Sequence, residues 1–214
     1  PETLHTNLLF GTISRDQKGR YYNTALVFGK HGELTGRYSK VHLVPFGEYT
    51  PFVQYFPFLG NISVAGTGFS SGEAHRPIET SIGSIGVLIC YEGIFPSITR
   101  DTVNNGGEVF VNITNDAWFG KTSAPYQHLA FYIFRAIETG RFVLRSANTG
   151  ISAIIDPKGR IESATTIFQG AVLQGKFSLK QEKTFYVRYG DYFIVVILLL
   201  FTLICAIKMR SLIS

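Results

Sequence analysis

A strand-like run that ends at a cysteine constrains this chain more than any other feature. Residues 85–89 are apolar and rich in β-branched side chains, and Cys90 follows them directly, ahead of a Tyr-Glu-Gly turn. A buried strand that delivers a thiol to its carboxyl end is how an α/β protein presents a nucleophile, because ligands bind outside those strand ends. A free cysteine is more often a small core residue, so the motif alone leaves both interpretations open.

Composition limits the class of protein. The chain has 214 residues, enough for one domain with a substantial core, and it starts at Pro1, so we expect a fragment or a trimmed product. The net charge of +5 fits a surface that meets anionic lipid headgroups, but it is too small and too scattered for nucleic-acid binding. Cys90 and Cys205, the two cysteines, suggest neither a disulfide framework nor a metal motif, and we expect no metal and no cofactor.

Hydrophobic patterns along the chain predict an α/β protein with a mixed sheet or sandwich. Pro45 and Gly47 exclude a regular element from the loop 40–49. We expect helices at 96–104 and 123–141, and strands at 7–13, 21–29, 34–38, 82–89, 108–114, 142–145, 150–155, 161–167 and 171–177.

Residues 51–60 form a dense aromatic stretch that includes Phe52, Phe56 and Phe58. The stretch has two prolines and no charge, so it is not built like a core strand. We interpret it as a loop or short helix. It either covers a pocket or touches lipid, or it is a rim packed on the core.

The composition changes near the C-terminus, where residues 192–207 contain no charge. A membrane span needs about 20 apolar residues, with about 17 as a lower limit. Lys208 and Arg210 can reach the interface at one end, so we favour a span over a buried core helix. The basic exit predicts a cytoplasmic C-terminus and a globular part that faces the periplasm of a bacterium.

A cysteine nucleophile needs a group that takes its proton and a group that stabilises the oxyanion. The chain has five histidines, and nothing in the sequence pairs one of them with Cys90. A carboxylate with a lysine is the other solution, and Lys40, Glu48 and Glu92 are the candidates. A lysine or glutamate in a sequence is far more often a solvated surface charge, so the residue types alone do not assign this role to any of the three.

Four motifs resemble the nitrilase superfamily and, within it, the apolipoprotein N-acyltransferase family. They are residues 37–49 (RYSKVHLVPFGEY), 89–92 (ICYE), 115–120 (NDAWFG) and 145–150 (RSANTG). The resemblance runs from about Asn7 to the C-terminal helix. It implies an α/β fold: a nitrilase-like αββα sandwich, truncated at its N-terminus, followed by one transmembrane helix. The implied boundaries are a catalytic domain at 1–183, a juxtamembrane linker at 184–191, the span at 192–209 and a cytoplasmic tail at 210–214.

The resemblance also implies roles for single residues. Members of the superfamily use a Glu-Lys-Cys triad, and the motifs match Cys90 to the nucleophile and Lys40 to the triad lysine. Glu48 matches a further glutamate of the lysine loop, while Tyr91 and Glu92 match the residues that follow the family's cysteine.

The triad glutamate is the weak point of the match. Glu2 lies in a Pro-Glu-Thr string similar to the family's Trp-Pro-Glu motif, but too few residues separate it from the strand expected at Asn7 for the family's helix. Either the true base lies upstream of this chain or the helix has been lost, and we favour the first.

The implied reaction transfers a fatty acyl group from a phospholipid, through a Cys90 thioester, to the N-terminal α-amine of a diacylglyceryl-cysteine apolipoprotein. The implied location is the bacterial inner membrane, with the catalytic domain in the periplasm. Expected substrate contacts are Phe52, Phe56, Phe58, Asn115, Trp118 and Phe119. Two alternatives stay open: an amidase of the same superfamily that uses water, and an inactive membrane-anchored remnant.

Overall fold

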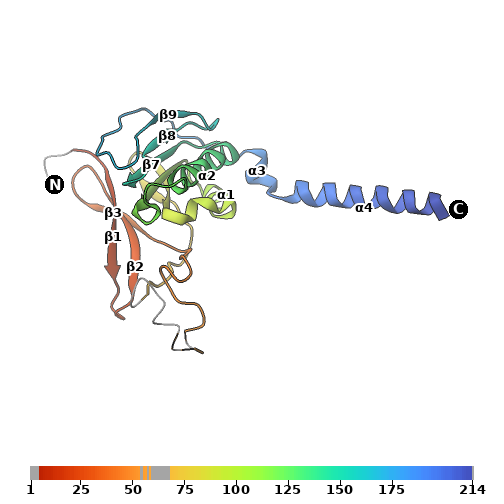
Figure 1. Cartoon of the computed structure of the whole chain (residues 1–214). Helices are drawn as coiled ribbons and strands as arrows, with labels where there is room; N and C mark the ends of the chain where they lie inside the picture. The colour runs from red at the N-terminus through yellow and green to blue at the C-terminus, as the bar shows by residue number, and fades with distance from the viewer. Residues whose placement is uncertain (1–4, 54, 57, 59–67, 214) are drawn as a thin grey trace.

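The computed structural model describes residues 5–53, 55, 56, 58 and 68–213 (Figure 1). Its strands are β1 (Leu8–Arg15), β2 (Tyr21–Phe28), β3 (Leu34–Ser39), β4 (Ile78–Thr80), β5 (Gly83–Ile89), β6 (Val109–Asn115), β7 (Val143–Asn148), β8 (Ala153–Ile155) and β9 (Ile161–Ala164). The helical elements are η2 (Cys90–Ile94), α1 (Pro96–Asn104), η3 (Asp116–Phe119), α2 (Ala124–Thr139), α3 (Phe185–Tyr189) and α4 (Tyr192–Ile213).

Most expected elements are confirmed to within a few residues, but the strand expected at 171–177 is wrong. That segment has an apolar pattern, yet it runs unpaired beside the sheet, and Val172 is 88% exposed. Gly175 crosses so close to Ile154 that a Cβ there would overlap the isoleucine side chain. The short β4 was not expected. It exists because Ile78 and Thr80 pair with β5.

The larger sheet has the order β4-β5-β6-β7-β8-β9. Its central strands β5, β6 and β7 are parallel, and the outer pairs are antiparallel. Parallel strands need crossover connections, and α1 and α2 supply them. The carboxyl ends of β5, β6 and β7 therefore meet at one edge of the sheet.

Two apolar cores, one on each face of β5, hold the layers together. Leu88 and Phe110 point toward the α1–α2 side and pack with Tyr132. Val87 and Ile89 point the other way and pack on Ala25, Val27 and Tyr38 of the smaller sheet, whose order is β1-β2-β3. Each fully buried side chain of this size contributes about 1.5–3 kcal/mol.

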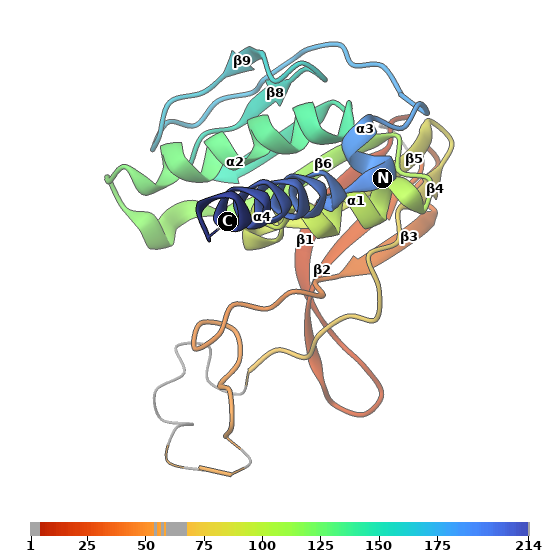
Figure 2. The ribbon, with the colours of Figure 1, turned by 90° about the vertical axis from the view of Figure 1, so that its right-hand side faces the viewer.

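The described residues thus form three layers: helices, a six-stranded sheet and a three-stranded sheet. Figure 2 shows α1 and α2 side by side on one face of the larger sheet. This is the order of the first three layers of the expected αββα sandwich.

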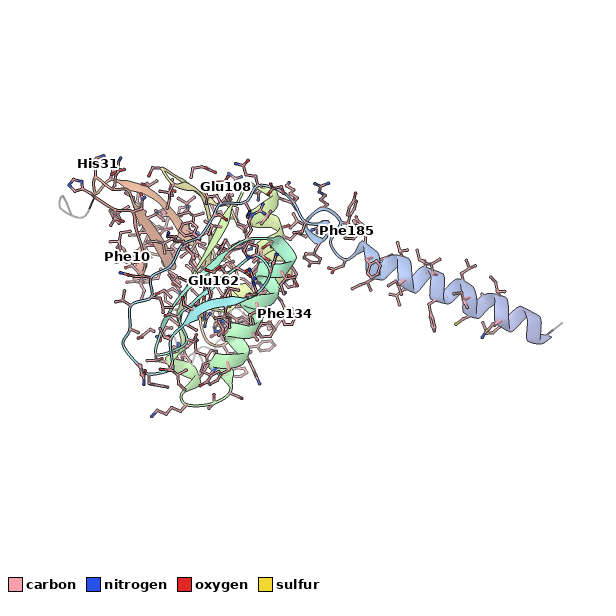
Figure 3. All side chains as sticks on the ribbon, turned by 90° about the horizontal axis from the view of Figure 1, so that it is seen from above. Phe10, His31, Glu108, Phe134, Glu162 and Phe185 are labelled. Carbon is pink, nitrogen blue, oxygen red and sulfur yellow. The ribbon has the colours of Figure 1, made fainter. Side chains whose placement is uncertain are left out.

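The helix α4 projects away from the globular body (Figure 1). Residues Tyr192–Met209 have a mean hydropathy of 2.6 and are not buried against the body, so the helix is long and apolar enough to cross a membrane. The residues expected to form only a linker contain the short helix α3, which contacts α1 and α2. Figure 3 shows Phe185 of α3 at the junction between the body and α4.

Candidate active site

The candidate site lies where β5, β6 and β7 end. Cys90 follows β5, and Asn115 and Asn148 are paired residues at the ends of β6 and β7. The Asn148 amide donates to the Asn115 side-chain oxygen over 3.2 Å, and the same oxygen accepts from the Ala117 backbone N–H. The ends of β6 and β7 and the loop after β6 are thereby tied together, beside the end of β5.

Cys90 has a strained backbone. Its φ is +51°, a region that side chains other than glycine rarely adopt, and such a conformation costs about 1–3 kcal/mol. This backbone conformation turns the chain from β5 into η2 within one residue. The side chain is partly buried, packed against the second apolar core. Cys90 is therefore neither a fully buried core residue nor a freely exposed thiol.

Lys40 follows β3, and its side chain is almost fully buried. Its ammonium donates to Glu48 Oε2 over 2.6 Å. Glu48 also accepts from the Val44 N–H at 2.9 Å and from the Asn23 amide at 3.1 Å. An ammonium has three N–H bonds. Within the described part of the chain only Glu48 accepts from it, so Lys40 is held in place with donor capacity left for a substrate or a further carboxylate.

Glu92 connects the lysine loop to the cysteine turn. Its carboxylate is fully buried and accepts four hydrogen bonds, from the Tyr38 hydroxyl and the backbone N–H groups of Val41, His42 and Ile89, at 2.8–3.1 Å. Burial raises the pKa of Glu92, and these donors oppose that rise. Oε1 accepts three of these bonds and Oε2 the fourth, so both oxygens are engaged and the geometry favours a positioning role for Glu92 over direct proton transfer.

The loop after β6 leads to a second buried cluster. Asp116 in η3 accepts from Arg145 on β7 at 2.6 Å and lies 3.0 Å from His128 Nδ1 on α2. His128 Nε2 and the Tyr132 hydroxyl both lie within hydrogen-bond distance of the Cys90 carbonyl, at 3.3 Å and 2.6 Å. The cluster therefore reaches the backbone of the cysteine turn from the helix side.

The expected substrate contacts differ in exposure. Trp118 is 72% exposed, and Phe52, Phe56 and Phe58 are also exposed, which is compatible with lipid contact. Phe119 is half-buried, because its ring packs edge-on against His128. Tyr91 is exposed and packs edge-on against Phe95. Glu2 lies outside the described residues.

No group of three or more histidine, cysteine or carboxylate side chains that could hold a metal ion occurs within the described ranges.

Sequence patterns did not identify His128 and Tyr132 as neighbours of Cys90, nor Asp116 and Arg145 as the pair behind His128. His128 and Tyr132 are spaced by four residues on α2, which places them on one face of that helix. That spacing was the available signal. It is also the signal of an ordinary core face, so it does not single out these two residues.

The fold and site together define a class of protein: a nitrilase-type α/β sandwich with a cysteine at the end of a parallel strand. The carbon-nitrogen hydrolase from Helicobacter pylori G27 superposes with a TM-score of 0.62 at 18% identity, covering 78% of this chain and 60% of that one. Nit3 of Saccharomyces cerevisiae, a member of branch 10 of the nitrilase superfamily, superposes with a TM-score of 0.58 at 22% identity, covering 73% and 54%.

The chain belongs to the carbon-nitrogen hydrolase family, whose model matches residues 1–184. Among curated proteins it is 46% identical over 194 residues to the apolipoprotein N-acyltransferase of Geobacter metallireducens, covering 89% of this chain and 37% of the relative. The apolipoprotein N-acyltransferase of Bdellovibrio bacteriovorus is 36% identical over 213 residues, covering 92% and 39%. The chain thus spans well under half the length of these relatives.

Proposed function

We propose that this chain is the catalytic part of an apolipoprotein N-acyltransferase. One observation supports the proposal most: Cys90 sits in a strained turn at the end of β5, and Glu92 ties that turn to the loop of a buried, carboxylate-paired lysine. The names of the curated relatives supply the substrate class, a lipoprotein acceptor.

In the first half-reaction the Cys90 thiolate attacks the carbonyl carbon of a phospholipid acyl ester. The S–C bond forms, the ester C–O bond breaks, and the lysophospholipid alcohol leaves with a proton. Lys40 stabilises the oxyanion with its remaining N–H donors, while Glu48 holds the ammonium in position. The thiol proton goes to a carboxylate base, for which Glu2 is the candidate within this chain.

In the second half-reaction the α-amine of the diacylglyceryl-cysteine attacks the thioester. The N–C bond forms and the S–C bond breaks, so the products are an amide and the regenerated thiol. Such two-step transfer through a covalent enzyme is nucleophilic catalysis. A thioester suits it, because it stores acyl reactivity for the amine as long as water is kept away.

We place the protein in the bacterial inner membrane, anchored by α4, with the body on the periplasmic side. The apolar length of α4 and the basic residues at its end support this placement. Under this proposal the domain limits are 1–183 for the body and 192–209 for the span. The exposed Phe52, Phe56, Phe58 and Trp118 are candidates for acyl-chain contact.

A hydrolase that transfers the acyl group to water is the second candidate, because the solved proteins of this fold include an amidase from Nesterenkonia sp. AN1 in which acrylamide has added to the active-site cysteine. That structure matches with a TM-score of 0.56 at 20% identity, so it supports the fold and not the substrate.

One experiment separates the candidates. The protein is reconstituted in phospholipid vesicles, and Cys90 is examined by intact-protein mass spectrometry, with Cys90→Ala as control. We expect a mass increase of one acyl group that is lost to a lipopeptide amine. An adduct lost only to water would support the hydrolase, and no adduct would support the inactive remnant.

A further inference from the structure

The backbone carbonyl of Cys90 is held by two donors from one helix. The Tyr132 hydroxyl donates to it at 2.6 Å, and His128 Nε2 lies 3.3 Å away. A carbonyl oxygen only accepts, so Nε2 carries a hydrogen in this contact. Tyr132 is fully buried, and burial keeps its pKa above the ordinary value, so the hydroxyl retains its proton.

Holding this carbonyl also fixes the next amide. The Cys90–Tyr91 peptide is trans, and in a trans peptide the C=O and N–H bonds point in opposite directions. With the carbonyl directed at α2, the Tyr91 N–H is directed away from that helix. It is one of the first amides of η2, which have no partner within the helix. This N–H, on the residue next to the thiol, is thereby pointed in one direction.

We propose that Tyr132 and His128 are positioning residues that fix the plane of the Cys90–Tyr91 peptide, so that the thiol and the Tyr91 N–H meet the same acyl carbonyl. This inference rests on the proposed function for its substrate, and it deepens the role of the same site.

The surroundings of both side chains fit such a role. A Cβ at Gly93 would overlap the Tyr132 ring, so the glycine lets the phenol lie directly under η2. His128 is held from behind by Asp116, which is itself held by Arg145 at 2.6 Å. The positions of both donors are therefore set by packing and charge.

The test compares two reactions of Cys90 in the whole protein. Acylation by p-nitrophenyl acetate or by vesicle phospholipid passes through an oxyanion, whereas alkylation by iodoacetamide does not. Tyr132→Phe removes one hydroxyl. A small misplacement of a reacting group can slow a reaction a hundredfold, so we expect the rate of acylation to fall about tenfold to a hundredfold. The ester concentration that gives half the maximal rate, and the rate of alkylation, should each change by less than about twofold.

Two further variants make the test specific. Tyr126→Phe removes a hydroxyl from an exposed position on the same helix and should leave both reactions unchanged. His128→Gln keeps an N–H donor where Nε2 lies, and His128→Leu does not, so the glutamine variant should retain more acylation than the leucine variant.

Equal acylation by Tyr132→Phe and Tyr126→Phe would overturn the inference, as would a parallel loss of acylation and alkylation. If the wild-type thiol reacts with p-nitrophenyl acetate and not with phospholipid, the proposed function fails. The inference is then decided by comparing the variants in their reaction with p-nitrophenyl acetate alone. A wild-type thiol that reacts with neither ester contradicts both.

Discussion

At the scale of single residues, the site depends on one unfavourable backbone conformation that its neighbours hold in place. The φ of Cys90 costs about 1–3 kcal/mol. Glu92 binds the turn from the side of the lysine loop, and Tyr132 and His128 bind it from the helix side. Strain of this kind persists only where surrounding contacts over-determine it, and here two independent sets of hydrogen bonds do so.

Replacing Glu92 by glutamine tests the first set. Glutamine offers one oxygen in place of two, so at least one of the buried N–H groups of Val41, His42 and Ile89 loses its acceptor. We expect Glu92→Gln to lower the free energy of unfolding by about 1–3 kcal/mol, measured by urea denaturation. Glu162→Gln, at an exposed position on β9, should change it by less than about 0.5 kcal/mol. Equal stability of the two variants would show that Glu92 does not brace the turn.

The second set, in which His128 is held by Asp116, predicts that the stability of the folded protein is sensitive to acid. Burial by itself would raise the pKa of Asp116, but the contact with His128 and the charge of Arg145 outweigh it and hold that pKa below 3.8. A lowered pKa means that the ionised group stabilises the folded state above its unfolded pKa, and that this contribution disappears as the pH falls through the folded pKa.

We therefore expect Asp116→Asn to be less stable than the wild type by about 3–5 kcal/mol at neutral pH, because Arg145 loses its buried partner. The difference should be constant down to about pH 4 and shrink below it. Urea denaturation over a pH series measures the size of this stability difference and its dependence on pH. A difference that stays the same to about pH 3 would mean that Asp116 does not titrate with folding.

At the scale of elements, the loops around the parallel strand ends have contrasting surfaces. The inner side of η3 carries Asp116, which is buried and paired, while the outer side carries Trp118, which is exposed. Phe52, Phe56 and Phe58 add further exposed aromatic surface. An exposed aromatic group of this size favours contact with an apolar partner, and an acyl chain is the partner that the proposed reaction requires.

Changing Phe52, Phe56 and Phe58 together to serine tests that contact. Because the side chains are exposed, each change should alter the folding stability by less than about 0.5 kcal/mol. Burying one phenylalanine is worth about 1.5–3 kcal/mol, so acyl-enzyme formation from vesicle phospholipid should fall at least tenfold, as measured by mass spectrometry.

The control for this variant is Leu34→Ser, an exposed apolar position at the far end of β3 from Lys40, which should keep normal acylation. Unchanged acylation in the triple variant would rule out a role of these aromatic side chains in acyl-chain contact.

At the scale of the whole molecule, the body and α4 are built for different surroundings. The body buries two apolar cores, whereas α4 exposes apolar side chains all around its axis (Figure 3). A helix that is apolar on every side is stable in a lipid bilayer. The short helix α3 joins the two parts, packed on α1 and α2, so α4 starts close to the helix layer of the body.

The proposed sidedness rests on the basic end of α4 and can be measured by thiol labelling. In a background in which Cys90 and Cys205 are serines, Val172→Cys should react with a membrane-impermeant maleimide once the outer membrane is permeabilised. Met209→Cys should react only after the inner membrane is opened. The reverse pattern would place the body in the cytoplasm and contradict the proposed substrate access.

Local patterns predicted much of this structure. The limits of α1, α2 and β1 to β3 followed from apolar periodicity and from Pro and Gly positions, because these elements satisfy their own backbone hydrogen bonds or pair with chain neighbours. The strand expected at 171–177 failed because a strand exists only where a partner edge is available, and pairing is not a local property.

The sequence by itself determined the cysteine at the end of a buried strand, the motifs around Lys40 and Glu48, and the apolar length of α4. Only the tertiary structure decided what surrounds the cysteine. Glu92 holds the cysteine turn because the backbone of the Lys40 loop donates hydrogen bonds to it. His128 and Tyr132 reach Cys90 because α2 packs against η2, the turn that follows β5. The physical reason is that a hydrogen bond depends on distance and direction in space, and residues far apart along the chain acquire both only when the layers pack.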